Sequence, residues 1–270
     1  MSVKGNSFTL NLKYTGLALV SIPLLPIMYF QGKQIRTKVP KLSEAQGNKG
    51  LAKSPSSKAL SIITIGESTI AGVGVATHEE GFTGTLAKAL SEKLQAEVSW
   101  KVYARSGYEA KTVTQKLIPK ITETEVDLIV IGLGANDAFT LNSPWRWAAD
   151  IDELILALKS KFGETPILFT NMPPIKLFPA FTPLIKFVMG NLVEILGEAL
   201  NMLVQRHSNV YYDARIISFE NWTEEIGIQA EPSAYFSDGV HPSLLTYQIW
   251  AKAMAKLITE NETISKSLAK

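Results

Sequence analysis

Cysteine is absent from this chain of 270 residues. Disulfide bonds, zinc sites built from thiolates and catalysis by a cysteine nucleophile are therefore excluded. The absence is compatible with a reducing or an oxidising compartment, so it does not locate the protein. Charged residues make up 19% of the chain and hydrophobic residues 46%, which is the balance of a globular protein with a substantial core.

Acidic residues are absent from positions 1–41, although six basic residues lie there. Positions 42–270 contain 21 basic and 25 acidic residues, so this part of the chain is mildly acidic. No basic stripe of the kind that binds nucleic acid is evident, and we expect no nucleic-acid partner. A nucleotide-binding loop is not indicated either, because Gly72-Val73-Gly74 lacks a third glycine at the right offset and no Gly-Lys-Ser/Thr follows.

The stretch from Tyr14 to Gly32 lacks any charged residue and is mostly apolar. As a helix this stretch would extend about 28 Å at roughly 1.5 Å per residue, close to the thickness of a bilayer core. Aromatic residues near both of its ends are typical of a membrane interface. We predict that residues 1–41 form a single N-terminal membrane anchor and that the protein is attached to a membrane through residues 14–32. A cleaved signal peptide and a buried or interfacial helix are the alternatives.

Two basic residues precede the apolar stretch and four follow it. Under the positive-inside rule, this difference would place the C-terminal side in the cytoplasm. A short lysine-bearing N-terminus often stays inside instead, so both orientations are kept and the side of the membrane is left open.

Residues 42–58 are polar and small without an apolar period, which predicts a linker to a folded domain over residues 59–270. In that domain, short apolar runs alternate with amphipathic stretches. This alternation indicates an α/β fold with a mostly parallel sheet covered on both faces. The five expected strands are 59–65, 98–104, 126–132, 166–170 and 210–212, and the expected helices are 82–94, 145–162, 184–206 and 243–259.

Polar residues follow the ends of the expected strands, where parallel sheets bind their ligands. Ser68 comes after the first strand, at a tight turn that contains Gly66. Gly107 follows the second strand, and glycine lets the backbone come close to a ligand. Asn136 follows the third strand, so its amide is expected at the same edge of the sheet.

Asp238 and His241 are three residues apart, just before the last expected helix. A carboxylate this close to an imidazole can fix its tautomer and stabilise its protonated form. A serine nucleophile needs a base of this kind, and Ser68 is the candidate serine at the sheet edge.

Four blocks of the chain resemble those of the SGNH hydrolases, also called GDSL esterases and lipases. In that family a serine lies in Gly-Asp-Ser, a glycine stands alone, an asparagine lies in Gly-x-Asn-Asp, and an aspartate and a histidine form Asp-x-x-His. The resemblance covers about residues 59–260. In chain order, the matching residues are Ser68, Gly107, Asn136, Asp238 and His241.

The resemblance implies a three-layer α/β/α sandwich with a flavodoxin-like, mostly parallel sheet of five strands. It also implies a serine esterase in which Ser68 attacks an acyl carbonyl, His241 takes the serine proton and Asp238 orients His241. The oxyanion hole would consist of the backbone N–H groups of Ser68 and Gly107 and the side-chain amide of Asn136. Such an enzyme needs no metal or cofactor, and its substrate is a small-molecule or lipid ester.

Glu67 departs from the family pattern, which has aspartate before the serine, and we expect an altered hydrogen bond with retained catalysis. Acyl transfer to an alcohol acceptor and a non-catalytic binding domain on the same fold are the alternative functions. The other histidines, His78 and His207, lack a paired acid in a matching motif and are expected at the surface. The apolar, proline-rich stretch 172–189 is expected either to line an acyl pocket or touch the membrane, or to pack in the core.

Overall fold

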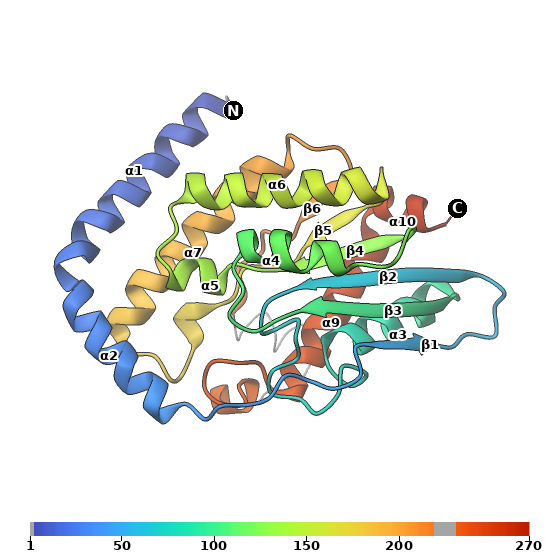
Figure 1. The fold of residues 1–270 in the computed structure, drawn as a ribbon, viewed down its shortest axis with the longest axis horizontal. Coiled ribbons are helices and arrows are strands. Elements are labelled where there is room, and N and C mark those ends of the chain that lie inside the picture. The colour runs from blue at the N-terminus through green and yellow to red at the C-terminus, as the bar shows by residue number, and fades with distance from the viewer. Residues whose placement is uncertain (1–2, 219–230, 270) are drawn as a thin grey trace.

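The computed structural model describes residues 3–218 and 231–269. Its centre is a mixed sheet of six strands in the order β1-β3-β2-β4-β5-β6 (Figure 1). Strands β2 to β6 pair in parallel, in the flavodoxin-like order, and β1 pairs antiparallel with β3. The strands are β1 (Lys49–Ala52), β2 (Ala59–Gly66), β3 (Glu97–Ala104), β4 (Leu128–Gly132), β5 (Ile167–Phe169) and β6 (Val210–Tyr212).

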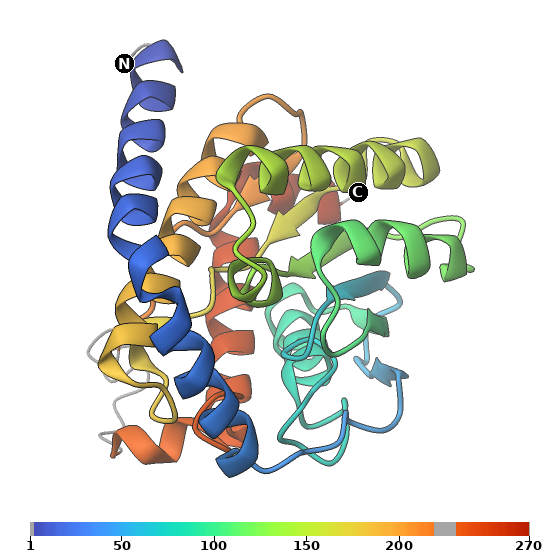
Figure 2. The same ribbon diagram turned by 60° about the vertical axis from the view of Figure 1, so that its left-hand side comes forward.

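Helices cover both faces of this sheet, which confirms the predicted three-layer α/β/α fold (Figures 1 and 2). Successive side chains of β2 point to opposite faces, as the strand period requires. Ile63 packs into one core with α4, α6 and α7, and Ile62 packs into the other core with α3, α9 and α10. The helices of these two layers are α3 (Phe82–Leu94), α4 (Ala110–Lys116), α6 (Pro144–Phe162), α7 (Pro183–Val204), α9 (Leu244–Glu260) and α10 (Glu262–Leu268).

Short elements complete the described chain. Helix α5 (Ala135–Phe139) follows β4 directly. The short helices α4, α5 and α10 were not expected from the sequence, because one or two turns carry too few residues to establish an apolar period. The remaining short turns of 3-10 helix are η1 (Ile22–Leu24), η2 (Ile118–Lys120), η3 (Ile175–Leu177) and η4 (Pro232–Tyr235).

Strand β1 corrects the expectation of a linker over residues 42–58. The strand extends the sheet at its β3 edge, and its Gly50 lies so close to the Trp100 ring that a Cβ there would approach the ring to 2.3 Å. Upstream of the strand, the Ala45 N–H donates to the Ala71 carbonyl at 2.9 Å. The sequence gives no signal for this strand because its backbone supplies the pairing, while its side chains are only exposed or half-buried.

The N-terminal segment consists of α1 (Val3–Ser21), η1 and α2 (Leu25–Lys38), and it runs along α7 (Figures 1 and 2). Lys13 forms an ion pair with Glu198 of α7 at 2.6 Å. The side of the segment that faces away from α7 exposes large apolar side chains. Residues Ser7–Lys38 are long and apolar enough to cross a membrane, and a signal sequence would satisfy the same criteria. The exposed apolar residues are Phe8, Leu12, Leu19, Val20, Ile22, Ile27, Tyr29 and Phe30.

Helix α7 also has the length and composition of a membrane span, but it belongs to the core. In that helix, 67% of the most apolar stretch of 18 residues is buried inside the protein. The stretch 172–189, which leads into α7, is partly core and partly surface. Ile175 and Val188 are buried, whereas Phe187 is 51% exposed.

The close approach of β2 and β4 yields a prediction at Gly66. A Cβ at this position would lie 2.3 Å from the Gly132 carbonyl oxygen, a backbone atom that cannot move aside. We therefore expect Gly66→Ala to lower the free energy of unfolding by about 1–3 kcal/mol through overpacking. Thermal unfolding of the variant and of its control in the same detergent measures the effect. The control is Gly16→Ala in α1, where nothing lies within 4 Å of the added Cβ. Equal melting temperatures for the two variants would contradict the prediction.

Candidate functional site

Ser68 lies two residues beyond the carboxyl end of β2, in a turn closed by backbone hydrogen bonds. The Ala71 N–H donates to the Glu67 carbonyl at 2.8 Å, and the Val73 N–H donates to the Ser68 carbonyl at 3.1 Å. These bonds hold Ser68 half-buried at the edge of the sheet. The strand order reverses between β2 and β4, which is the point where such sheets bind ligands.

Glu67 connects this turn to the loop that follows β4. Its carboxylate is 2% exposed and accepts one backbone N–H on each oxygen, from Ala135 at 2.8 Å and from Asn136 at 2.9 Å. Burial raises the pKa of Glu67 to about 8, although the backbone N–H groups favour the ionised form. The residue next to Ser68 thus determines where Asn136 lies. The sequence indicated a changed hydrogen bond here but not its partners.

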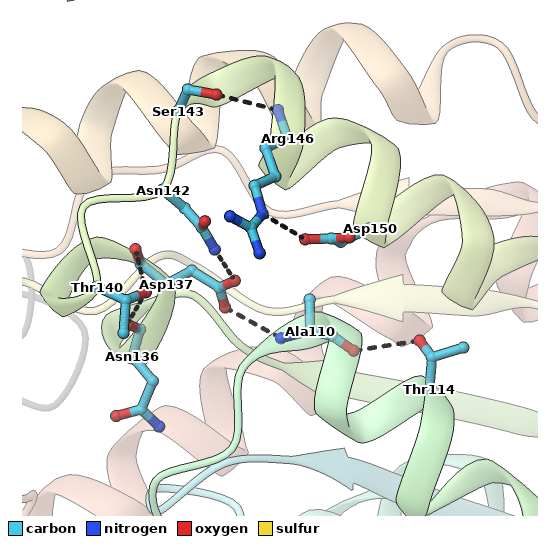
Figure 3. Close-up of polar contacts among 9 residues, drawn as sticks. All are labelled: Ala110, Thr114, Asn136, Asp137, Thr140, Asn142, Ser143, Arg146 and Asp150. Carbon is cyan, nitrogen blue, oxygen red and sulfur yellow. Dashed lines mark hydrogen bonds and ion pairs between the residues drawn. The ribbon is translucent and has the colours of Figure 1, made fainter.

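Asn136 lies in the first turn of α5 and has one amide hydrogen engaged. Its Nδ2 donates to the Tyr108 carbonyl at 3.1 Å, which orients the amide and leaves its second hydrogen for another acceptor. Its side chain points away from the polar cluster around Asp137 (Figure 3). Asn136 therefore reaches from the end of β4 to the loop that follows β3.

Asp137 secures α5 from the opposite side. This fully buried carboxylate accepts the Ala110 N–H at 3.2 Å and the Asn142 side-chain amide at 2.9 Å (Figure 3). Burial raises its pKa to about 7, against the effect of these two donors. Because Ala110 begins α4, Asp137 and Asn136 together fix the loop that contains Gly107.

Gly107 has a φ of +81°, a conformation that favours glycine, although a Cβ there would meet nothing within 4 Å. Glu44 holds the adjacent residues of the loop. Its carboxylate accepts the Ser106 N–H at 2.7 Å and pairs with Arg105 at 3.0 Å. Sequence reasoning missed Glu44, because it belongs to no motif and lies in the stretch expected to be a linker.

Asp238 and His241 form a hydrogen-bonded pair. Asp238 Oδ2 lies 2.8 Å from His241 Nδ1, and Oδ1 accepts the backbone N–H groups of Val240 at 2.9 Å and His241 at 2.7 Å. Burial alone would raise the pKa of Asp238, but the hydrogen bonds from His241 and Val240 outweigh it and hold the pKa below its ordinary value. An ionised Asp238 engages Nδ1 of the ring, so Nε2 is the nitrogen available to a second partner.

All five predicted site residues line one cavity with a volume of about 1350 Å³. Within residues 3–218 and 231–269, no hydrogen bond joins the Ser68 hydroxyl to His241. Catalytic hydrogen bonds are often long in the absence of substrate and tighten when it binds. Further lining comes from α2 and from the stretch 172–189, neither of which belongs to a family motif.

The other two histidines differ from expectation. His78 is buried rather than exposed, and burial lowers its pKa. His207 is half-buried and does have a paired acid, because its Nε2 lies 2.7 Å from Asp152. Spacing in the sequence could not reveal a partner 55 residues away. Across the described parts of the chain, no three histidine, cysteine, aspartate or glutamate side chains gather as metal ligands would.

Solved structures with this fold include several enzymes that act on acyl groups. The lipase Lip_vut3 from a goat-rumen metagenome has a TM-score of 0.54 and 19% identity, over 73% of this chain and 96% of that one. An acetylxylan esterase from Geobacillus stearothermophilus has a TM-score of 0.52 and 16% identity, over 73% and 93%. A salicylyl-acyltransferase from a tetracycline biosynthetic pathway has a TM-score of 0.50 and 16% identity, over 76% and 56%. At these identities the likeness shows the fold alone.

A comparison with curated proteins gives no significant match. The model of the GDSL-like lipase/acylhydrolase family, however, matches residues 64–249. This range is more than half of the chain and contains the turn with Ser68, the loops with Gly107 and Asn136, and the Asp238–His241 pair. The chain therefore belongs to the GDSL-like lipase/acylhydrolase family.

Proposed function

We propose that this protein is a serine esterase that hydrolyses an ester-linked acyl group. The observation that carries the proposal is that a hydrogen-bonded Asp238–His241 pair lines the same cavity as Ser68, Gly107 and Asn136. A base with a fixed tautomer, a hydroxyl in a tight turn and an oriented amide are the groups that acyl transfer requires.

In the proposed reaction, Ser68 Oγ attacks the acyl carbonyl while His241 Nε2 takes the hydroxyl proton. Asp238 stabilises the imidazolium that forms. The negative charge on the carbonyl oxygen is met by the N–H groups of Ser68 and Gly107 and by the free amide hydrogen of Asn136. The ester bond breaks, and the alcohol leaves with the proton from His241. Water then attacks the acyl-serine and gives a proton to His241, which passes it to Ser68 Oγ as the acyl–Oγ bond breaks and the acid is released.

Acyl transfer is the second candidate, because the same acyl-serine can react with an alcohol instead of water. Its support is the fold shared with a salicylyl-acyltransferase. Adding alcohol acceptors to the assay distinguishes the two: a transferase forms a new ester in proportion to the acceptor, whereas an esterase releases the free acid. A non-catalytic binding domain would do neither.

Membrane attachment through the N-terminal segment is part of the proposal. Its support is the row of exposed apolar side chains between Phe8 and Phe30. Because the opposite side of the segment packs along α7, an orientation in the plane of the membrane suits it better than an isolated crossing. The interfacial alternative is therefore favoured over a single span and over a cleaved signal peptide.

Replacement of the proposed nucleophile and base tests the mechanism. We expect Ser68→Ala and His241→Ala each to lower kcat on p-nitrophenyl esters by more than about 10³, because residues of a triad act as a unit. A fluorophosphonate probe should label the wild-type protein and fail to label Ser68→Ala. The matched control is Ser106→Ala, which removes another serine hydroxyl that lines the cavity and should leave labelling intact. A folded wild-type protein that is not labelled would rule out both enzymatic functions.

Glu67 provides a second test of the site. We expect Glu67→Gln to lower kcat at least about 10-fold, because an amide NH₂ cannot accept a backbone N–H and would displace Asn136, whereas both oxygens of a carboxyl group accept in either protonation state. Glu67→Asp keeps both acceptor oxygens and should lose less activity. Wild-type kcat from Glu67→Gln would show that this carboxylate does not position Asn136.

The buried Glu67 also predicts a dependence of stability on pH. Its pKa is raised from an ordinary value of 4.5 to about 8, so the folded state holds a proton that the unfolded state releases between these values. The free energy of unfolding should therefore fall as the pH rises from about 5 to about 8. Denaturant titrations at several pH values measure this slope. Glu67→Gln should reduce the slope, and the part that Asp137 contributes should remain. An unchanged slope in Glu67→Gln would contradict the prediction.

A further inference from the structure

Helix α2 forms one wall of the cavity that contains Ser68. Leu25, Met28 and Ile35 contribute apolar side chains from this helix. A hydrogen bond of 2.6 Å between Gln31 and Thr182 ties the helix to the start of α7. The N-terminal segment is therefore part of the cleft as well as the proposed attachment to a membrane.

The lining next to α2 is also apolar. It is built by Phe178, Phe181, Ile185 and Met189, from the stretch that leads into α7 and from α7 itself. Ring contacts join Phe181 to Phe178 at a centroid distance of 5.3 Å. The cavity of about 1350 Å³ exceeds the common range of roughly 300–1000 Å³ for small-molecule pockets. This apolar lining and this volume suit a long acyl chain.

Basic side chains line the same cavity from α2 and the residues after it. Lys33, Arg36 and Lys41 are exposed, and in the part of the chain that the structure describes none of them forms an ion pair. Two carboxylates, those of Asp238 and Glu109, also line the cavity, and the Asp238 carboxylate is engaged by His241. The wall at α2 is thus positively charged, which complements an anionic group.

The cavity and the exposed apolar surface meet on α2. Tyr29 lines the cavity and is nevertheless 70% exposed, and its neighbour Phe30 is 65% exposed. A helix with exposed apolar residues and basic residues beside them lies stably at the surface of an anionic membrane. In that orientation, the cavity would border on the lipid from which a substrate comes.

We propose that α2 is the substrate-selecting wall of the cleft and that the substrate is an acyl ester of an anionic lipid. The acyl chain lies along the apolar lining that α2 and α7 contribute, the anionic headgroup lies at Lys33, Arg36 and Lys41, and the ester carbonyl lies at Ser68. Water cleaves the acyl–oxygen bond, which gives a carboxylic acid and an anionic lipid alcohol. This inference rests on the proposed esterase function and adds the substrate class and the residues that select it.

The test compares two lipids that differ only by a phosphate group, 1-palmitoylglycerol 3-phosphate and 1-palmitoylglycerol, in the same neutral micelles. The readout is the ratio of their kcat/KM values at low salt. The double variant Lys33→Gln/Arg36→Gln should lower this ratio about 30-fold, since each basic residue near an anionic headgroup contributes about 1 kcal/mol and 1.4 kcal/mol is tenfold. The control Lys38→Gln removes an exposed charge from the same helix outside the cavity and should leave the ratio unchanged.

Each outcome decides the proposal. An unchanged ratio in the double variant, or an equal fall with Lys38→Gln, would overturn it. A wild-type protein that hydrolyses p-nitrophenyl butyrate through Ser68 but neither palmitoyl lipid would overturn the substrate class and leave the esterase function standing. Charge-sensitive hydrolysis of palmitoyl-CoA without hydrolysis of the lipid would also overturn it, in favour of a soluble thioester. Absence of all Ser68-dependent hydrolysis would refute the esterase function itself.

Discussion

The two hydrogen bonds that Glu67 accepts from the backbone of Ala135 and Asn136 are the contact on which the site depends. They join the turn after β2 to the loop after β4, at the point where the strand order reverses. Gly66 allows the two strand ends to approach closely enough for this contact, and Gly132 leaves room for the Ile70 side chain of the turn. Without this contact, the bond from the Glu67 N–H to the Gly132 carbonyl at 3.2 Å would still join the turn to β4, but Asn136 itself would lose its anchor to the turn.

From that contact, a chain of hydrogen bonds extends across the edge of the sheet. Asn136 reaches the carbonyl of Tyr108, Asp137 holds the N–H at the start of α4, and Glu44 holds the N–H of Ser106. The Gly107 loop is thus fixed on both sides before any substrate binds. Donors arranged in advance stabilise developing charge without reorganisation during the reaction, which is the main electrostatic advantage of an oxyanion hole.

Most of the fold follows from the sequence, because buried strands and long amphipathic helices carry strong apolar periods. The helix predicted over 82–94 and the strand predicted over 210–212 have the same bounds in the structure. Strand β1 and helix α5 could not be found in this way, since one pairs through its backbone and the other has five residues. The parallel orientation of most strands followed from the alternation of strands and helices, but the extra antiparallel strand at the edge did not.

The candidate site, like the fold, could be predicted from the sequence only in part. Its five motif residues were found from sequence because each lies at a strand end or in a recognisable short block, and the structure brings all five to one cavity. The partners of Glu67, the role of Glu44 and the wall at α2 were not found. Each of these depends on a contact between segments far apart in the chain, which leaves no local pattern.

The N-terminal segment is therefore difficult to separate from the domain. The same stretch of chain supplies the apolar wall of α2, then the basic side chains up to Lys41, and three residues later Glu44, which holds the backbone beside Gly107. A displacement of α2 on a membrane would be transmitted over this short path to one of the proposed oxyanion donors. The proposed membrane attachment and the proposed oxyanion donor at Gly107 are consequently linked by a short stretch of chain and by the Glu44 carboxylate. Residues 1–58 therefore belong to the working enzyme that we propose.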